Sequence, residues 1–593
     1  MYILNFKKHS YSALVFSIVL MIALALVLLI FNPTKVHAAT ITVTNTNDSG
    51  AGSLRQAITD ANTSVGVADT IEFAIGSGQQ SIAPTTPLPF ITDTLTIDGT
   101  TQPGGATCGT NFIDRNLLIE INGTSDGTDS LLRFDSGSDG STIKGLVLNR
   151  GGLAISAALT MVDSDNHTVQ CNNIGTNFAG TVGLNSQNTG IATITSNGVT
   201  IGGTNPGEGN IVSGNASTPN NGDGIRINGN GSTIRGNYVG VGTNGECIGN
   251  GDGQGIGITG NNNIVGGNTP EARNVISCHT TVGRGDGIDI VGAFGTPSTG
   301  NVVQGNYIGT NINGGVEAGY GNSSGIVILG DAENNMIGGT GVGDGNVVAG
   351  NGLGIVNLSY QAFLAINNSI LGNKIFSNSG GVISSLGIDN VQTNDNDFVN
   401  FINAGVTLND ADDIDYNGTN TGTNHYLNFP VINSITSTDG QITINYDLDI
   451  NDAEAGATGY RIEFFANDAA DPSGYGEGQT FLGYENVAGD VTGQSVTLTL
   501  PAGVEGNKFI SATTTMTDNS TDGFGHTSEF GALVEGNLVP TGSVTPAPEA
   551  QLASTGRNSS LLLLLISFMV VATGGVGLYM VIYKSSYFPI DRK

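Results

Sequence analysis

The stretch CNNIGTN (171–177) recurs three times further along the chain. The later copies are GNYVGVGTN (236–244), GNYIGTN (305–311) and GNKIFSN (372–378). Their aligned asparagines are Asn172, Asn237, Asn306 and Asn373. The copies are almost evenly spaced, and such a period is typical of folds in which one structural unit stacks on the next. The 593-residue chain is therefore expected to form an elongated stack instead of one compact core.

Two further phrases recur between these copies. One comprises GNIVSGN (209–215), RNVISCH (273–279) and GNVVAGN (345–351), and the other GIRI (224–227), GIGI (255–258), GIDI (287–290) and GIVI (325–328). Each is a short strand of alternating apolar residues between Gly or Asn turns. Strands this short bury their apolar side only if the chain winds into coils that stack.

The expected geometry follows from the strand rise. A coil of three short strands and three bends needs roughly 20 to 25 residues, so a repeat of about 67 residues is interpreted as three coils. Asparagine suits the bends because it tolerates left-handed backbone angles, and its amide can bond to an identical amide one coil away.

These features predict an all-β protein with a parallel β-helix over residues 39–400. A propeller has a period of about 40 to 50 residues and marker aromatic residues in each blade, whereas this chain contains no Trp. A leucine-rich solenoid needs a leucine frame that is absent. The coil length predicts roughly sixteen turns and a rod near 75 Å long.

The start of this region resembles a known group of proteins. TITVTNTNDSGAGSLRQAITDAN (40–62), ADTIEF (68–73) and TLTIDGTTQPG (94–104) are similar to the opening of exported right-handed parallel β-helix proteins of the pectin-lyase-like superfamily. The resemblance implies that a strand and a short amphipathic helix, with Leu54, Ala57, Ile58 and Ala61 on its apolar side, close the first coil. It implies little about function, because the superfamily includes lyases, hydrolases, adhesins and passive stalks.

A second module is expected after the repeat stops near residue 400. Residues 401–424 are acidic and rich in turn residues, which is typical of a hinge, and residues 538–550 form a Pro-bearing linker. Between them, residues 425–537 contain longer alternating strands, which predict an antiparallel β-sandwich. These strands include QITINYDL (441–448), YRIEFF (460–465) and SVTLTL (495–500). This part resembles a module that follows such β-helices in large surface proteins.

The N-terminus has the features of an export signal. Lys7 and Lys8 precede an uncharged run from Ala13 to Phe31, and VHAA (36–39) supplies small residues for a signal peptidase. A signal peptide over residues 1–38, cleaved after Ala38, is expected. The run is longer than a typical signal core, so an uncleaved membrane anchor is the alternative.

The C-terminus, residues 551–593, carries a short motif, an apolar run and a basic tail. The run Leu561–Tyr583 is long enough to cross a membrane, and the tail ends in Arg592 and Lys593. This order resembles a Gram-positive cell-wall sorting signal of the LAxTG form. The resemblance implies that a sortase recognises Leu552, Ala553, Ser554, Thr555 and Gly556, cuts after Thr555 and passes the acyl group to a peptidoglycan precursor. The alternative is an uncleaved membrane anchor.

The net charge indicates which partners are disfavoured, and the cysteine spacing indicates how the cysteines can pair. A formal charge of -31 disfavours nucleic acid and anionic lipid surfaces as partners. The four cysteines, Cys108, Cys171, Cys247 and Cys278, show no CxxC spacing and allow three pairings. Cys247 and Cys278 could be neighbours in a stacked fold, but buried free thiols remain an alternative.

Three groups of residues are candidates for a site on the rod or the hinge. Asp286, Asp289 and Arg226 are expected near one outward face, where carboxylates can serve a hydrolase and an arginine a lyase; recurrent turn aspartates are the alternative.

Tyr238 and Tyr307 are expected to point outward three coils apart, about 14 Å, where they can stack on sugar rings or simply cover the sheet. Asp413, Asp415 and Asn417 begin a calcium-loop pattern, but its twelfth position is Asn424 instead of Glu. A structural calcium ion is therefore the one cofactor considered, and an acidic linker is the alternative.

These observations predict a protein at the extracellular face, anchored to cell wall or membrane by its C-terminus, with a non-enzymatic role in adhesion or structure that includes binding to glycans or another cell surface. The alternative is a surface polysaccharide lyase or glycoside hydrolase on the same scaffold.

Overall fold

The computed structural model describes residues 15–22, 37–125, 130–151, 157–184, 189–215, 222–281, 284–292, 295–360, 363–379, 386–393, 405–413, 422–450, 456–520 and 522–542. Residues 15–22 are helical. Within these ranges no helix combines the length and apolar character needed to cross a bilayer. The apolar run 561–583, the sorting motif 552–556 and most of the signal segment lie outside the described residues.

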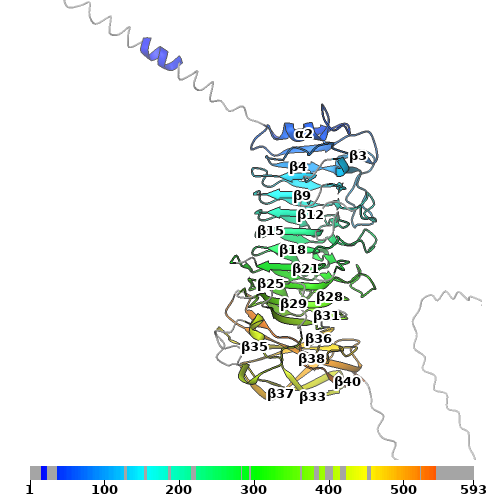
Figure 1. The fold of residues 1–593 in the computed structure, drawn as a ribbon, viewed down its shortest axis with the longest axis vertical. Helices are drawn as coiled ribbons and strands as arrows, with labels where there is room; N and C mark the ends of the chain where they lie inside the picture. The colour runs from blue at the N-terminus through cyan, green and yellow to red at the C-terminus, as the bar shows by residue number, and fades with distance from the viewer. Residues whose placement is uncertain are drawn as a thin grey trace, which may run out of the picture. The chain divides into compact units, whose positions relative to one another are not determined.

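Three long parallel sheets form a β-helix (Figure 1). Sheet A contains β1 (Thr40–Val43), β2 (Asp69–Phe73), β4 (Leu95–Asp98), β7 (Thr142–Lys144), β10 (Thr168–Gln170), β13 (Thr200–Gly202), β16 (Thr233–Arg235), β19 (Ile264–Gly266), β23 (Val302–Gln304), β27 (Met336–Gly338) and β30 (Ser369–Leu371). Sheet B contains β3 (Gln80–Ile82), β5 (Ile119–Asn122), β8 (Leu146–Asn149), β11 (Asn173–Ile174), β14 (Ile211–Val212), β17 (Tyr238–Val239), β20 (Val275–Ile276), β24 (Tyr307–Ile308), β28 (Val347–Ala349) and β31 (Lys374–Phe376). Sheet C contains β6 (Leu132–Phe134), β9 (Ala157–Val162), β12 (Thr189–Ile194), β15 (Asp223–Asn228), β18 (Ile256–Thr259), β21 (Ile288–Gly292), β25 (Ser324–Gly330), β29 (Leu353–Tyr360) and β32 (Ile388–Thr393). A small pair, β22 (Ser298–Thr299) and β26 (Ala332–Glu333), accompanies them.

The expected coil length was too short. Asn172, Asn210 and Asn237 lie on three successive coils, and each hydrogen-bonds the next. The interval from Asn172 to Asn237, which is one full sequence repeat, therefore spans two coils instead of three. Sheet A accordingly has eleven strands, not sixteen. At a strand spacing of about 4.8 Å it extends about 48 Å, shorter than the predicted rod of about 75 Å.

A continuous column of buried asparagines runs beside sheet B. Each side-chain oxygen accepts both the backbone N–H and the side-chain Nδ2–H of the preceding member, at 2.9 to 3.2 Å. The column, ladder 1, consists of Asn172, Asn210, Asn237, Asn274, Asn306, Asn346 and Asn373. Each coil thus satisfies the buried polar groups of the next.

Two further ladders occupy other bends. Ladder 2 contains Asn215, Asn250, His279, Asn322, Asn351 and Asn378. Ladder 3 contains Asn263, Asn301, Asn335 and Asn368. Between the sheets the core is a stack of isoleucines and valines, such as Ile225, Ile256, Ile288 and Ile326, aligned strand over strand and fully buried.

The first coil is closed as the resemblance implied. Helix α2 (Leu54–Ala61) buries Leu54, Ala57, Ile58 and Ala61, and the Ser53 hydroxyl accepts the Gln56 N–H at its N-terminus. Short 3₁₀ turns, η1 (Gly99–Thr101), η2 (Gly123–Ser125) and η3 (Pro270–Ala272), complete individual coils.

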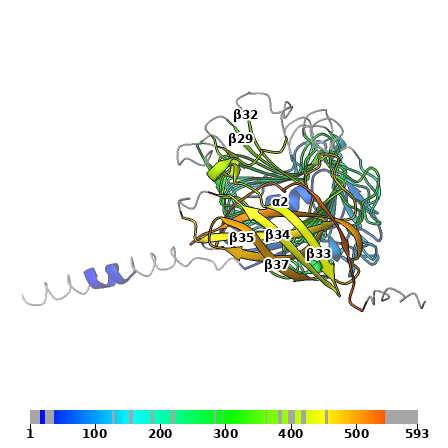
Figure 2. The ribbon, with the colours of Figure 1, turned by 90° about the horizontal axis from the view of Figure 1, so that it is seen from below.

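The C-terminal module has two antiparallel sheets that share one apolar core. One contains β33 (Val431–Thr438), β34 (Gln441–Leu448) and β37 (Val491–Thr499). The other contains β35 (Gly459–Asn467), β36 (Thr480–Val487), β38 (Gly506–Thr517), β39 (Phe524–Thr527) and β40 (Val534–Leu538). The core between them includes Tyr446, Ile462 and Phe464. Seen along the rod, these strands cross the end of the β-helix (Figure 2).

The module closes the last coil with side-chain acceptors. The Glu477 carboxylate accepts the backbone N–H groups of Ser377 and Asn378 at 2.7 and 2.9 Å, and so ends ladder 2. Glu463 accepts the Gly372 N–H, and the Thr527 hydroxyl accepts the Ile370 N–H, both at 2.9 Å. These bonds replace the partners that another coil would have supplied.

Apolar contacts and the connecting segment strengthen this junction. Phe465 and Phe530 of the module belong to the same buried cluster as Ile375 of the last coil. The segment before the module includes η4 (Ala411–Asp413) and η5 (Thr423–Tyr426). Asn424, within the segment expected to be a hinge, is fully buried, accepts the Asn368 N–H and so ends ladder 3. Residues 414–421 lie outside the description.

All four cysteines are paired. The bonds are Cys108–Cys171 and Cys247–Cys278, so the neighbour interpretation of Cys247 and Cys278 is confirmed and free thiols are absent among the described residues. Each bond joins loops from different coils and restricts the unfolded chain.

The ladder gives a direct test of the fold. Asn274→Ala removes two donated and two accepted hydrogen bonds in a buried column and should lower the free energy of unfolding by about 3 kcal/mol. Chemical denaturation measures the loss. Asn230→Ala, in an exposed row of similar bonds, is the matched control and should change stability little. Equal losses for both variants would contradict the role given to the buried column.

Candidate functional site

Sheet C brings together three carboxylates. Arg226, Gly257 and Asp289 occupy one column on three successive strands, β15, β18 and β21. Asp223 forms an ion pair with Arg226 and accepts the Gln254 N–H at 3.1 Å. Asp286 lies just before β21 in the chain. We call Asp223, Asp286 and Asp289 the sheet C carboxylates.

The environment of these groups opposes ionisation. They are 2 %, 8 % and 6 % exposed, respectively. Burial raises the pKa of Asp286 to about 6, although hydrogen bonds from Ser324 act in the opposite direction. Burial, with the charges of Asp286 and Asp223, raises the pKa of Asp289 well above its usual range.

Asp223 differs because it has a cationic partner. Burial raises its pKa, while the Arg226 guanidinium partly offsets that rise. When two acids lie close together and only one is paired with a cation, the paired acid is the one favoured as an ionised carboxylate. The unpaired acid is the one favoured as a proton donor. The Oδ1 atoms of Asp286 and Asp289 have no hydrogen-bond partner among the described residues.

The sequence located part of this cluster. It predicted Asp286, Asp289 and Arg226 near one face. The structure has Arg226 and Asp223 on β15 and Asp289 on β21, two strands apart in sheet C with β18 between them, and Asp286 just before β21. It did not predict the burial, nor the role of Gln254, whose side chain hydrogen-bonds Asp289. Gln254 is not part of a recurrent motif, so the sequence gives no reason to single it out until the coil register is known.

The two predicted sugar-stacking tyrosines are in a different arrangement. Tyr238, Val275 and Tyr307 form one column, so the tyrosines are two coils apart, not three. The Phe112 ring stacks on Tyr238 with centroids 4.0 Å apart, and the Arg273 guanidinium lies 4.1 Å from the Tyr307 ring centroid. Each ring therefore has one face covered by the protein itself.

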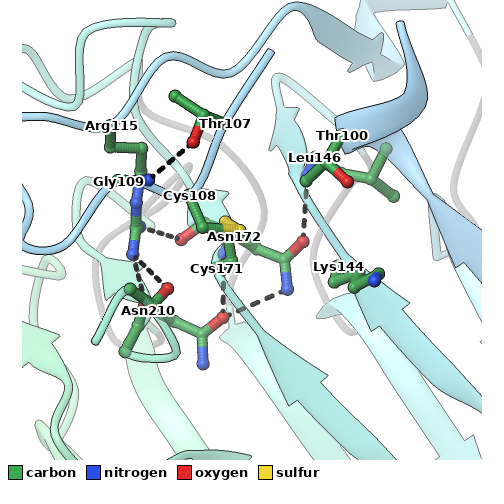
Figure 3. Close-up of a disulfide and its surroundings, with 12 residues drawn as sticks. Thr100, Thr107, Cys108, Gly109, Arg115, Lys144, Leu146, Cys171, Asn172 and Asn210 are labelled. Atoms are coloured by element: carbon green, nitrogen blue, oxygen red, sulfur yellow. Dashed lines mark hydrogen bonds between the residues drawn. A yellow bond between two sulfur atoms is a disulfide. The ribbon is translucent and has the colours of Figure 1, made fainter. Parts of the chain in front are cut away.

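The loop that contains Phe112 is linked to the coils of sheet B by a disulfide and by hydrogen bonds of Arg115 (Figure 3). The Cys108–Cys171 disulfide ties it to the coil of Asn172. Arg115 donates from Nη1 to the Asn172 carbonyl at 3.2 Å and from Nη2 to the Gly209 carbonyl one coil further on. The loop thus spans successive coils.

A hollow of about 430 Å³ lies beside this loop. Its lining includes Phe112, Arg115, Tyr238, Glu271 and Arg273, and we call it the Arg115 groove. Sequence reasoning missed it, because its walls come from segments on different coils that are far apart along the chain. The only signal was the single Tyr238.

A group of exposed carboxylates could hold a metal ion. Asp412, Asp449 and Asp490 have oxygen atoms within 4.8 Å of one another. The predicted calcium residue Asp413 is buried and is not a member of this group, while Asp415 and Asn417 lie outside the described residues. Oxygen donors of this kind suit hard cations.

The sheet C carboxylates make stability depend on pH. The folded protein retains protons that the unfolded chain releases near pH 4, so the free energy of unfolding should fall as the pH rises from about 4 through about 6. A rise in pKa of about two units corresponds to about 3 kcal/mol. Asp289→Asn removes one buried acid and should raise the melting temperature at pH 7.5 more than at pH 4. The exposed Glu505→Gln is the control, and an equal effect of Asp289→Asn at both pH values would refute the assignment.

No protein-family model and no curated protein matches this chain.

Proposed function

We propose that the protein is an exported surface rod, attached by its C-terminus to a Gram-positive-type envelope, with a structural or adhesive role. Its β-helix is proposed to be of the right-handed, pectin-lyase-like type. The observation that carries the proposal is the closure of both ends. Helix α2 covers the first coil, and the antiparallel module covers the last through Glu477, Glu463 and Thr527.

Closure at the C-terminal end has a mechanical consequence. The β-helix and the antiparallel module share hydrogen bonds and one apolar cluster, so a tether at the end of the module holds the coils as a single body. Two disulfides and three buried ladders add resistance to unfolding, which suits an extracellular location.

The proposed attachment uses the terminal segments. Residues 1–38 direct export, and the Leu552–Gly556 motif is the sortase substrate, with the apolar run 561–583 as a temporary membrane stop. A peptidoglycan precursor accepts the acyl group of Thr555. A calcium ion at Asp412, Asp449 and Asp490 is proposed as a structural addition to the module.

Attachment is tested by Thr555→Ala. The wild-type protein should stay with the wall after detergent extraction and be released by a muralytic enzyme, whereas the variant should extract with detergent. Ser554→Ala, at the variable position of the motif, is the control and should remain wall-linked. Full detergent extraction of the wild type would refute covalent sorting.

A second candidate function is glycoside hydrolysis, which the sheet C carboxylates favour over lyase chemistry. Hydrolysis uses one carboxyl group as proton donor and a second as base or nucleophile. Asp286, with a pKa of about 6, matches the donor, and Asp223, paired with Arg226, is the group with a cation to keep it ionised. Arg226 is held by that ion pair, which opposes its use as a lyase base.

This candidate predicts new reducing ends when the protein is incubated with a polysaccharide panel. Asp286→Asn should lower such turnover at least 100-fold, because it removes the proton donor. Glu505→Gln should leave turnover unchanged. Unsaturated products would instead indicate a lyase, and absence of any turnover across the panel would leave the surface-rod proposal as the sole function.

A further inference from the structure

Ladder 2 contains one member that is not an asparagine. His279 lies between Asn250 of the preceding coil and Asn322 of the following coil, and its side chain is fully buried. Its Nε2 is 3.2 Å from the Asn250 Nδ2, and its Nδ1 is 3.0 Å from the Asn322 Oδ1. Among the members of the three ladders, only this side chain can gain a proton in mildly acidic solution.

The direction of the ladder determines which ring nitrogen carries the proton. The Asn322 Nδ2 donates to the Ile276 carbonyl and to the Asn351 Oδ1, at 3.1 and 2.9 Å, so its Oδ1 is the atom that faces the imidazole. An amide oxygen only accepts, and the Nδ1 of His279 is therefore the donor. The Nε2 is then unprotonated and accepts the Nδ2–H of Asn250.

The Asn250 amide is held in an orientation that cannot receive a second proton from His279. Its Oδ1 accepts the backbone N–H and the Nδ2–H of Asn215, at 3.2 and 3.0 Å. Its Nδ2 also donates to the Val212 carbonyl at 2.9 Å. Rotating the amide by half a turn would break all three bonds in a buried site. A proton added to Nε2 would consequently face an N–H group, and two opposed donors would replace one hydrogen bond.

The surroundings do not compensate for a positive charge on this ring. Burial lowers the pKa of His279 to about 4, although the bond to Asn322 acts in the opposite direction. The charges of the adjoining described segments do not contribute to this shift. The ionisable residues of those segments are Glu246, Asp252, Arg284, Asp286 and Asp289.

The nearby buried acids lose their charge before His279 gains one. Burial raises the pKa of Asp286 to about 6, and burial with neighbouring charges raises the pKa of Asp289 well above its usual range. Both are therefore mostly neutral at the pH at which the imidazole takes up a proton, so neither supplies a counter-ion.

The other two ladders of this part of the rod contain no group that titrates in this range. In ladder 1, Asn274 bonds to Asn237 and Asn306, and in ladder 3, Asn263 bonds to Asn301. Amide side chains keep the same donors and acceptors at any pH of interest. Protonation of His279 therefore disrupts one bend of the coil and leaves the register of the neighbouring coils in place.

We propose that His279 is a pH-sensitive break in ladder 2: when its imidazole is protonated, the bend that contains it opens, while ladders 1 and 3 hold the coils together. The rod is continuous at neutral pH and locally open at this coil in acid. This response belongs to the β-helix itself and requires neither hydrolysis nor wall attachment.

Acid is expected to weaken this bend. An unburied histidine binds a proton near pH 6.5, whereas the folded coil does so only near pH 4. The stabilisation that neutral His279 contributes is complete above about pH 6.5 and is lost as the pH falls through about 4. The sheet C carboxylates have the opposite dependence, because their pKa values are raised. The overall free energy of unfolding therefore does not isolate His279, and a local measurement is needed.

Hydrogen–deuterium exchange of the full chain, analysed by mass spectrometry of peptides, gives this local measurement. The informative amides are the His279 N–H, which donates to the Asn322 Oδ1, and the Ser323 N–H, which donates to the His279 carbonyl. Protection is compared at pH 7 and pH 4.5 after correction for intrinsic exchange. Peptides with these amides should lose at least tenfold in protection at pH 4.5, whereas peptides around Asn346 of ladder 1 should change little.

Variants assign the effect to the imidazole. His279→Asn places in ladder 2 the residue that its neighbours have, and its protection at pH 4.5 should equal that at pH 7. His167→Asn is the matched control, because His167 is also fully buried with a pKa lowered to about 4, but its Nε2 contacts the Ser164 hydroxyl, which can donate or accept. This control should keep the acid-induced loss at the bend of His279.

Three results would overturn the proposal. Equal protection of the His279 bend at both pH values would remove the response itself. The same acid-induced loss in His279→Asn would remove the role of the imidazole, and an equal loss along the whole rod would indicate global acid unfolding. Circular dichroism at pH 7 checks that His279→Asn folds, and His279→Gln replaces it if it does not. If neither variant folds, the wild-type comparison still decides, because only a loss confined to ladder 2 supports the proposal.

Discussion

The hydrogen bond from one asparagine amide to the next coil is the interaction on which the rest of the structure depends. Each coil makes a bend between sheets A and B that buries backbone N–H groups, and these must find partners inside the rod. Asn274 illustrates the solution, since its oxygen accepts from Asn237 while its nitrogen donates to Asn306 and to a backbone carbonyl. Many of the strands are very short, so they need this register to stay aligned.

The last asparagine of such a column has no further coil to bond, and the antiparallel module supplies the missing partners. The last asparagines of ladders 2 and 3 would face solvent with open donors and an exposed sheet edge. Glu477 and Asn424 occupy the places of the next ladder members, and Phe465 and Phe530 cover the apolar core. The second module thus supplies hydrogen-bond partners and apolar cover to the last coil.

The same register also determines where charges meet. Asp223 and Asp289 come from different repeats and lie on β15 and β21 of sheet C, with only β18 between them. Burial and the charges of Asp223 and Asp286 oppose the ionisation of Asp289. On sheet B, the fastened loop brings Arg115 to the same groove as Arg273, which comes from a distant part of a chain with few cations. Both groups of charged residues are assembled from segments that are far apart along the chain.

The sequence alone determined that short strands stack and that asparagines line the bends, because side-chain alternation and local turn preferences are properties of neighbouring residues. The closure of the first coil by Leu54, Ala57, Ile58 and Ala61 was implied by the resemblance to other β-helix proteins, and the structure has these residues buried in α2. The sequence could not determine the number of coils. Coils differ in length because their loops vary, as the unequal steps from Asn210 to Asn237 and from Asn306 to Asn346 show. The interpretation of each repeat as three coils was wrong because it assumed short loops throughout. The sequence could not determine the burial of Asp289, the covering of Tyr238 by Phe112 or the Arg115 groove either. Those depend on which coil lies next to which, and only the tertiary structure decides that.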